Sequence, residues 1–442
     1  MSTAQPTSQG VELLVLLVML ALVIAVITRR LRFPYTLALV IAGLVIGALH
    51  SVPNFTLNPS VVLFVFLPAL LFEGAWQMDV GALFDNWLSI VLLAVPGLAI
   101  SLLVVAAVVH WGAALPLGLA LLLGAIVSPT DPIAVLSLLR QIGMPDRLCA
   151  IIEGESLFND GVGAAAFELA LGALLLTLGL DGSLAGLPPP AVVLKGVWLF
   201  GGGIVIGVAI GVAVTWLVRA LDDPMIETAV TFCVAYGSYL LAQELGTSGL
   251  LCVVAAGLTV GSYGRRTGMS EATRTVVDTV WEFTGYVANS LLFLLLGVQI
   301  GASSLAPALP VIAWAVVGVL AGRALMVYLL LPLHDTLVRW AGSRARLRHP
   351  QAYGHLPVPA IWRPLILLSG LRGALSLALV LSLPATVPQR DLLARVVYGV
   401  VLFTLLAQGI ALRALLPHWP QVAAAAPAPP HAAPIADPPP LR

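Results

Sequence analysis

A polar stretch between Ser128 and Gly163 interrupts a chain that is otherwise almost unbroken hydrocarbon. It reads SPTDPIAVLSLLRQIGMPDRLCAIIEGESLFNDGVG and contains the carboxylates of Asp131, Glu153, Glu155 and Asp160. Carboxylates inside a bilayer are costly, and by default they mark an ion path or a proton relay. The chemistry that we expect here is the binding of a proton or a small cation by oxygen ligands.

The second half of this stretch predicts a helix with one polar face. Glu155 and Asn159 are four residues apart, as are Ser156 and Asp160, so each pair shares a face of an ideal helix. Together the four side chains cover an arc of about 140°. They offer two carboxylates, a hydroxyl and an amide oxygen, which are hard ligands suited to an alkali cation or a proton.

The first half of the stretch contains a helix-breaking pattern. Pro129 and Pro132 each remove an amide donor and disfavour helix in the preceding residue, so Thr130 and Asp131 are expected to be unwound. Carbonyl groups freed there could add ligands. A second weak point, SGLRGALS at 369–376, places a glycine on each side of Arg372. Irregular backbone at membrane depth is tolerated only where it is buried or lines a watery cavity.

The composition indicates a polytopic membrane protein. Of 442 residues, 60% are hydrophobic and only 10% are charged, whereas soluble domains carry about 25% charged residues. The net charge of zero argues against a nucleic-acid partner. The three cysteines do not indicate a disulfide framework. The N-terminus lacks a basic region, so the first apolar run is expected to be retained rather than cleaved.

Apolar runs long enough to cross a bilayer, which takes about 20 residues, predict thirteen transmembrane helices. The sequence after residue 416 is rich in Ala and Pro, so 417–442 is expected to be a disordered cytoplasmic tail. The thirteen expected spans are 10–28, 34–49, 59–77, 87–110, 114–139, 149–178, 194–220, 226–244, 246–263, 279–301, 308–333, 361–386 and 391–416.

The distribution of basic residues predicts the orientation. With the N-terminus outside and the C-terminus in the cytoplasm, cytoplasmic segments collect sixteen of the 21 basic residues, as the positive-inside rule requires. At about 1.5 Å per residue, Asp131, Asp160 and Arg372 then lie about 14–16 Å deep, near the bilayer midplane. The two interrupted spans, the fifth and the twelfth, are seven helices apart. An odd offset inverts the topology, so we expect inverted repeats with broken helices meeting at the site.

Charge counting indicates what the site binds. Arg372 alone cannot neutralise Asp131, Glu155 and Asp160 at one depth, so the remaining carboxylates must hold protons or a cation. Glu155 is the expected structural partner of Arg372. Glu73 and Arg323 are expected to form a separate buried structural pair. No cofactor is expected, since no histidine cluster indicates a transition-metal site and no nucleophile or Walker motif occurs.

Several segments resemble one known family. The runs SPTDPIAV (128–135), EGESLFNDG (153–161) and LRGALSLAL (371–379) resemble the monovalent cation/proton antiporter-1 family, which contains bacterial NhaP-type antiporters and animal sodium/proton exchangers. LPALLFEGA (67–75), SGLLCVVAAGLTVG (248–261) and ANSLLFLLLGV (288–298) support this resemblance. It implies thirteen helices, a homodimer, and a six-helix core (87–178 and 308–416) that moves against a dimerisation scaffold (10–77 and 194–301).

The resemblance also assigns roles to residues. Asp160 would bind Na⁺ or H⁺, with Thr130 and Asp131 contributing from the unwound segment and Glu155 and Ser156 from the helix of Asp160. The supporting residues would be Asn159 and Arg372, with Glu155 paired to Arg372. Electrogenic relatives are similar but have Asp at the position of Asn159, so Asn implies electroneutral exchange.

The expected function is secondary active exchange of Na⁺, or another monovalent cation, for H⁺ across the cell membrane. Three alternatives remain open at this stage. A K⁺/H⁺ antiporter would use the same oxygen ligands, and a cation channel could use the same residues as a filter. A membrane-embedded enzyme is disfavoured by the lack of a catalytic motif.

Overall fold

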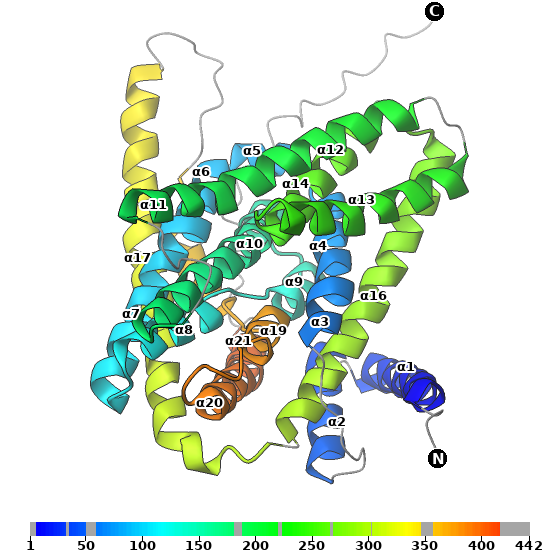
Figure 1. Ribbon diagram of the computed structural model, residues 1–442. Coiled ribbons are helices and arrows are strands. Elements are labelled where there is room, and N and C mark those ends of the chain that lie inside the picture. The colour runs from blue at the N-terminus through cyan, green and yellow to red at the C-terminus, as the bar shows by residue number, and fades with distance from the viewer. Residues whose placement is uncertain are drawn as a thin grey trace, which may run out of the picture.

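The protein is all-helical. The computed structural model describes residues 6–31, 35–49, 59–180, 188–219, 223–265, 268–301, 303–345 and 357–415. Within these residues every regular element is a helix (Figure 1), which confirms the predicted all-α class. The segment 417–442, predicted to be a disordered tail, lies outside the described residues.

The first half of the chain leads up to one long central helix, α10. In order it contains α1 (Pro6–Leu31), α2 (Tyr35–Ala48), α3 (Pro59–Val61), η1 (Val62–Phe66), α4 (Leu67–Gln77), α5 (Val80–Asp85), α6 (Trp87–Leu92), η2 (Leu93–Gly97), α7 (Leu98–Ala113), α8 (Leu117–Val127), α9 (Ile133–Gln141) and α10 (Asp146–Thr177).

The second half contains two further long helices, α16 and α17, and ends in a group of shorter ones. In order it contains α11 (Pro189–Val197), η3 (Trp198–Gly202), α12 (Gly203–Val218), α13 (Pro224–Glu244), α14 (Gly249–Thr259), η4 (Val260–Gly264), α16 (Glu271–Gly301), η5 (Ala306–Ala308), α17 (Leu309–Ala345), η6 (Ala360–Trp362), α18 (Arg363–Leu368), α19 (Ala374–Leu381), α20 (Arg390–Phe403), η7 (Thr404–Gln408) and α21 (Gly409–Leu415).

Seven continuous helices among the described residues are long and apolar enough to cross a membrane, so the chain is a multi-pass membrane protein. Shorter apolar helices accompany them, including α2, α8 and the run formed by α14 and η4. The seven long helices are Trp87–Ala113, Asp146–Thr177, Pro190–Val218, Pro224–Glu244, Glu271–Gly301, Ala306–Val338 and Arg390–Leu412.

Prolines inside two of the apolar helices are absorbed by single π-helical turns. Pro96 lies within η2, and Pro68 is the second residue of α4, which begins where η1 ends. A proline lacks the amide that an α-helix would use, and a π turn lets the helix continue past the missing bond. The helices therefore continue past these prolines.

The helix α10 lies at the centre of the fold. In the view of Figure 1 it lies between α17 and α16, and it packs against α6, α8, α14 and α19. Its neighbours thus come from both halves of the chain. The helix α10 therefore contacts α6 and α8 from the first half of the chain and α14 and α19 from the second half.

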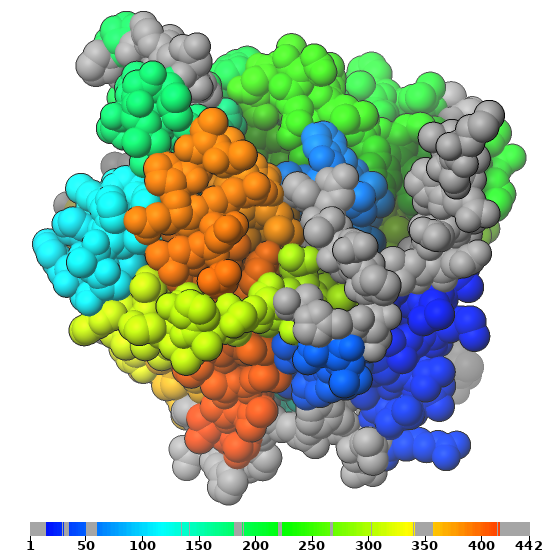
Figure 2. All heavy atoms as spheres, turned by 60° about the horizontal axis from the view of Figure 1, so that its bottom comes forward, coloured from blue at the N-terminus to red at the C-terminus, as the bar shows by residue number. Residues whose placement is uncertain are grey.

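Several connections gather on one face of the molecule. Figure 2 shows the cyan end of α7, the yellow-green segment before α17 and the orange turn before α20 side by side. Helices that begin and end at one membrane surface would be joined in this way.

The predicted boundary between the eighth and ninth spans is also found. The helix α13 ends just before Gly246, whose φ of +66° only glycine adopts freely.

The helices α2 and α16 pack closely against each other. A Cβ atom at Gly297 would lie only 2.9 Å from the Cα atom of Gly43. Gly301 approaches the backbone of α2 in the same way one turn further on. Small residues at such contacts allow two membrane helices to pack backbone to backbone. The helices α2 and α16 therefore form one tightly packed wall of the protein.

Replacing Gly297 by valine should destabilise this wall. We expect G297V to lower the stability by about 1–3 kcal/mol, the usual range for overpacking, seen as a lower thermal midpoint in detergent. The matched control is G237A on α13, where a new Cβ meets nothing within 4 Å. A G297V midpoint equal to that of G237A would contradict the packing described here.

Candidate ion-binding site

Two gaps in helical hydrogen bonding face each other in the middle of the protein. One separates α8 from α9, and the other separates α18 from α19. Pro129 and Pro132 explain the first gap, since neither can donate an amide hydrogen bond. The gaps are joined directly, because the amide of Asp131 donates to the carbonyl of Leu371 at 2.8 Å.

Gly373 allows this close crossing. A Cβ atom at this position would collide with the carboxylate of Asp131. The absence of a side chain lets the second gap lie directly against the first. The two irregular segments therefore form one compact unit, with Asp131 at its centre.

Arg372 caps the end of α8. It is fully buried, and its Nη1 atom donates to the carbonyl oxygens of Ser128 and Pro129, the latter at 2.9 Å. The last carbonyls of a helix lack donors within the helix and carry the negative end of its dipole. The predicted pairing of Arg372 with Glu155 is wrong, because Nη1 of Arg372 is bonded to these backbone oxygens and Glu155 is bonded to another arginine.

Glu155 pairs instead with Arg323 of α17. The pair is bidentate, with Nη1 on Oε1 and Nη2 on Oε2 at 2.9 Å, and the two residues are 1% and 2% exposed. Arg323 also donates to the carbonyl of Ile366 in α18, from Nη2 at 2.8 Å. Two buried arginines thus satisfy carbonyls at the ends of two interrupted helices.

The predicted pair of Glu73 with Arg323 is also wrong. Arg323 lies at the depth of Glu155, and α17 turns its guanidinium toward α10, where a fully desolvated cation needs a carboxylate. Glu73, on α4, lies on the other side of the cavity described below. Its Oε1 atom accepts a hydrogen bond from Nε2 of Gln77 at 2.7 Å.

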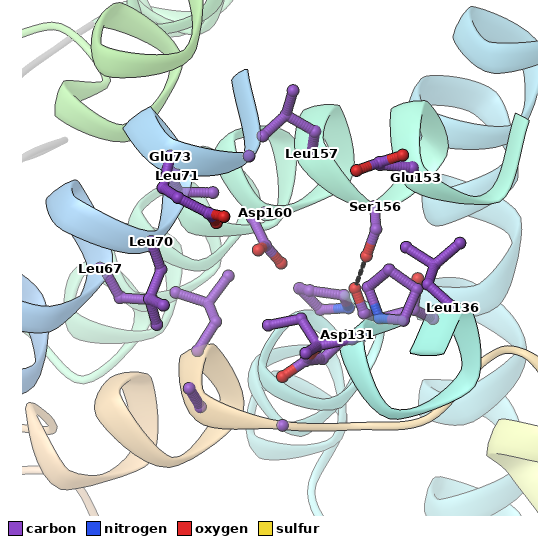
Figure 3. Close-up of a pocket in the computed structure, with 18 of the residues that line it drawn as sticks. Leu67, Leu70, Leu71, Glu73, Asp131, Leu136, Glu153, Ser156, Leu157 and Asp160 are labelled. Carbon is purple, nitrogen blue, oxygen red and sulfur yellow. Dashed lines mark hydrogen bonds between the residues drawn. The ribbon is translucent and has the colours of Figure 1, made fainter. Parts of the chain in front are cut away.

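Asn159 and Ser156 hold Thr130 in place. The side-chain oxygen of Asn159 accepts from the amide of Thr130 at 3.3 Å, and its Nδ2 donates to Oγ1 of Thr130 at 2.7 Å. The hydroxyl of Ser156 donates to the carbonyl of Thr130 (Figure 3). All three hydrogen bonds are buried. The unwound residue is therefore fixed by one face of α10.

Asp160 faces a cavity of about 130 Å³. Its carboxylate points toward Asp131 and Ser156 across this space (Figure 3). No hydrogen bond or ion pair reaches the carboxylate of Asp160 from any residue that the structure describes. An acidic group in this position must hold a proton or a cation to avoid an uncompensated charge. The cavity is lined by Thr130, Asp131, Ser156, Asp160, Glu73, Glu153, Ser376 and several leucines.

The structure thus brings together Asp160, Asp131, Thr130 and Ser156, as predicted for the site. Glu155 does not line the cavity, since its charge is already cancelled by Arg323.

Glu73 is the acidic residue that sequence reasoning misplaced. It lines the same cavity as Asp160. A Cβ atom at Gly285 would lie 2.9 Å from Cδ of Glu73, so this glycine makes room for the carboxylate. The signal in the sequence was a single carboxylate within the apolar run LPALLFEGA (67–75).

Charges around the cavity do not balance. Arg323 cancels Glu155, whereas Arg372, whose guanidinium is bonded to backbone carbonyls, keeps its single positive charge. Among the described residues this leaves the carboxylates of Asp131, Asp160 and Glu73 at the cavity without an arginine or lysine bonded to them. The interior therefore favours a bound cation or protons.

These observations define a multi-pass helical membrane protein with a carboxylate cavity between two interrupted helices. The sequence profile of the family described as "Sodium/hydrogen exchanger, transmembrane" matches residues 16–418. The chain belongs to this sodium/hydrogen exchanger family, as the resemblance in its motifs predicted.

Individual relatives support this assignment. The chain is 37% identical over 385 residues to the Na⁺/H⁺ antiporter ApNhaP of Aphanothece halophytica, covering 87% of this chain and 69% of that protein. It is 33% identical to the Na⁺/H⁺ antiporter NhaH of Halobacillus dabanensis, covering 92% and 96%. The solved structure of the sodium proton antiporter MjNhaP1 from Methanocaldococcus jannaschii superimposes with a TM-score of 0.71 at 20% identity, covering 95% and 99%. The fold is therefore shared with that antiporter.

The pair of Glu155 and Arg323 should be essential for stability. Replacing Arg323 by methionine leaves Glu155 buried and unpaired, which costs about 3–5 kcal/mol. We expect R323M to lower the thermal midpoint strongly and the double variant E155Q/R323M to recover part of the loss.

The exposed ion pair of Arg140 with Glu153, at 2.7 Å, provides the control. Because its arginine side chain is 56% exposed, R140Q should change stability by about 0–1 kcal/mol. Equal midpoints for R323M and R140Q would refute the role given to the buried pair.

Proposed function

We propose that this protein is a secondary active transporter that exchanges Na⁺, or a related monovalent cation, for H⁺ across the cell membrane. The observation that carries the proposal is the Asp160 carboxylate, which faces the cavity without a protein partner. The names of its relatives support it, since ApNhaP and NhaH are both described as Na⁺/H⁺ antiporters.

The ligands around Asp160 suit a small, hard cation. Carboxylate oxygens of Asp131 and Asp160 and the hydroxyl oxygens of Thr130 and Ser156 line one cavity. Such oxygens bind alkali cations, and a protonated carboxyl group loses the negative charge that neutralises the cation. Cation and proton therefore compete for Asp160, so the apparent KM for the cation rises as the pH falls.

Exchange in this scheme is electroneutral. Asn159, next to Asp160, is neutral and is committed to Thr130 through two hydrogen bonds. One cation or one proton therefore loads Asp160, and each leaves the site with the same net charge. One cation moves for each proton.

We further propose thirteen membrane crossings arranged as inverted repeats, with the fifth and twelfth spans broken at the gaps beside Asp131 and Arg372. A core of about 87–178 and 308–416 would move against a scaffold of about 10–77 and 194–301 and expose the site to each side in turn. The cavity supports this division, since it lies between α4 and the helices α10 and α19. The N-terminus would lie outside, the C-terminus in the cytoplasm, and two copies would form a homodimer.

Asp160 is the residue to test first. In proteoliposomes we expect D160N to abolish proton movement driven by Na⁺, Li⁺ or K⁺, because an amide can neither hold a proton nor neutralise a cation. The cation that drives the wild-type protein identifies the substrate. The control is E271Q, which removes an exposed carboxylate at the start of α16. Exchange by D160N at the wild-type rate would end the assignment.

Charge balance can be measured separately. If each cycle moved one net charge across the membrane, a potential of 100 mV would contribute about 2.3 kcal/mol to exchange. That free energy would shift the ratio of cation concentrations on the two sides at equilibrium about fifty-fold. We expect the ratio to be unchanged when a potassium diffusion potential of this size is imposed. A shift of that magnitude would rule out 1:1 exchange, and a cation current without proton movement would identify a channel.

A further inference from the structure

A second cavity, of about 170 Å³, lies on the other side of Asp160 along α10. Its lining includes Ala164 and Glu168 of α10, Leu379 and Ser382 at the end of α19, and Gln243 of α13. The first cavity is lined by other residues of α10 and α19. Both cavities therefore lie along the same two helices.

Only one helical turn separates the two cavities. On α10, Asp160 lines the first and Ala164 the second, a separation of about 6 Å along the axis. On α19, Leu375 lines the first and Leu379 the second. Between them Gly161 packs tightly on Leu251, where a Cβ atom would have no room. The barrier is thin and apolar.

The second cavity is polar in a way that suits a cation. The hydroxyl of Ser382 donates to the carbonyl of Leu379 at 2.8 Å, and that of Thr247 donates to Ala242 at 3.1 Å. Because each hydroxyl donates its hydrogen bond to a carbonyl, the lone pairs of its oxygen stay available to a cation. Glu168 adds a carboxylate whose side chain is 46% exposed.

A cation from the protein already lies beside this carboxylate. Nζ of Lys195, on α11, is 3.8 Å from Oε1 of Glu168. Lys195 is the only lysine in the chain. The distance is that of an ion pair without a tight hydrogen bond. An alkali cation that reaches this carboxylate would compete with the ammonium group for it.

We propose that the second cavity is the vestibule through which the cation reaches Asp160 from the face opposite the first cavity, and that Glu168 docks it there in competition with Lys195. The inference rests on the proposed function. In the proposed orientation this face is external. Lys195 then acts as a tethered competitor that sets the apparent affinity on that side alone.

Exchange measured from each face separately tests the vestibule. In everted and right-side-out vesicles we expect E168Q to raise the KM for Na⁺ about two- to fivefold, the range of an exposed ion pair, with kcat unchanged. K195M should lower KM by a similar factor. Both shifts should occur only when Na⁺ is supplied on the face of Glu168.

The double variant and a matched control separate this from a general surface-charge effect. K195M should have no further effect in an E168Q background, because Lys195 acts through Glu168. E244Q removes an exposed carboxylate of α13 that lies outside the cavity lining, and it should leave KM unchanged. An unaltered KM in E168Q, or equal shifts from both faces, would overturn the proposal.

A labelling experiment keeps the inference testable even if exchange itself were absent. In a C233S background, which removes the exposed cysteine, S382C should react with a membrane-impermeant thiol reagent from this face only. E168Q should lower the ratio of cationic to anionic reagent rates about two- to fivefold, and K195M should raise it. Failure of S382C to react from this face would refute the vestibule. A wild-type protein that labels as described but exchanges no cation would refute the proposed function alone.

Discussion

Two buried guanidinium groups hold the centre of this protein together. Arg372 caps the carbonyl end of α8, and Arg323 satisfies a carbonyl of α18 while it neutralises Glu155. Without them, two helix ends with partial negative charge would face carboxylates in a region without bulk water. Neither arginine is bonded to Asp131 or Asp160 among the described contacts. The unbalanced charge of the site thus follows from how the helix breaks are stabilised.

The packing of helices differs between the α2–α16 contact and the cavity beside α4. The contact of α2 with α16 brings backbones together at glycines and allows little adjustment. The wall of the cavity formed by α4 instead presents Leu67, Leu70 and Leu71, and Leu157 of α10 lines the same cavity (Figure 3). Smooth apolar side chains can slide past one another at little energetic cost, since no polar bond has to be broken. A moving core would be expected to part from its scaffold at such a surface.

Sequence reasoning predicted which residues lie together better than it predicted the directions of their side chains. The constant rise of a helix placed Asp131, Asp160 and Arg372 at one level, and the spacing of Asn159 and Ser156 placed them on the face that holds Thr130. The partners of the arginines depend instead on how α17 and the second gap are rotated about their axes. That rotation is set by packing with distant segments, so the pairs of Glu155 with Arg372 and Glu73 with Arg323 were wrong. Glu73 was misplaced for the same reason.

The link between the two gaps determines where this protein can bend. An interruption in a helix is commonly a point of flexibility, but here the amide of Asp131 is bonded to the carbonyl of Leu371, and Gly373 lies against the same carboxylate. Neither gap can open alone without breaking the other. The crossed segments should therefore travel as one stiff block, with the ligands in fixed relation. Any change of shape would then fall outside these two segments.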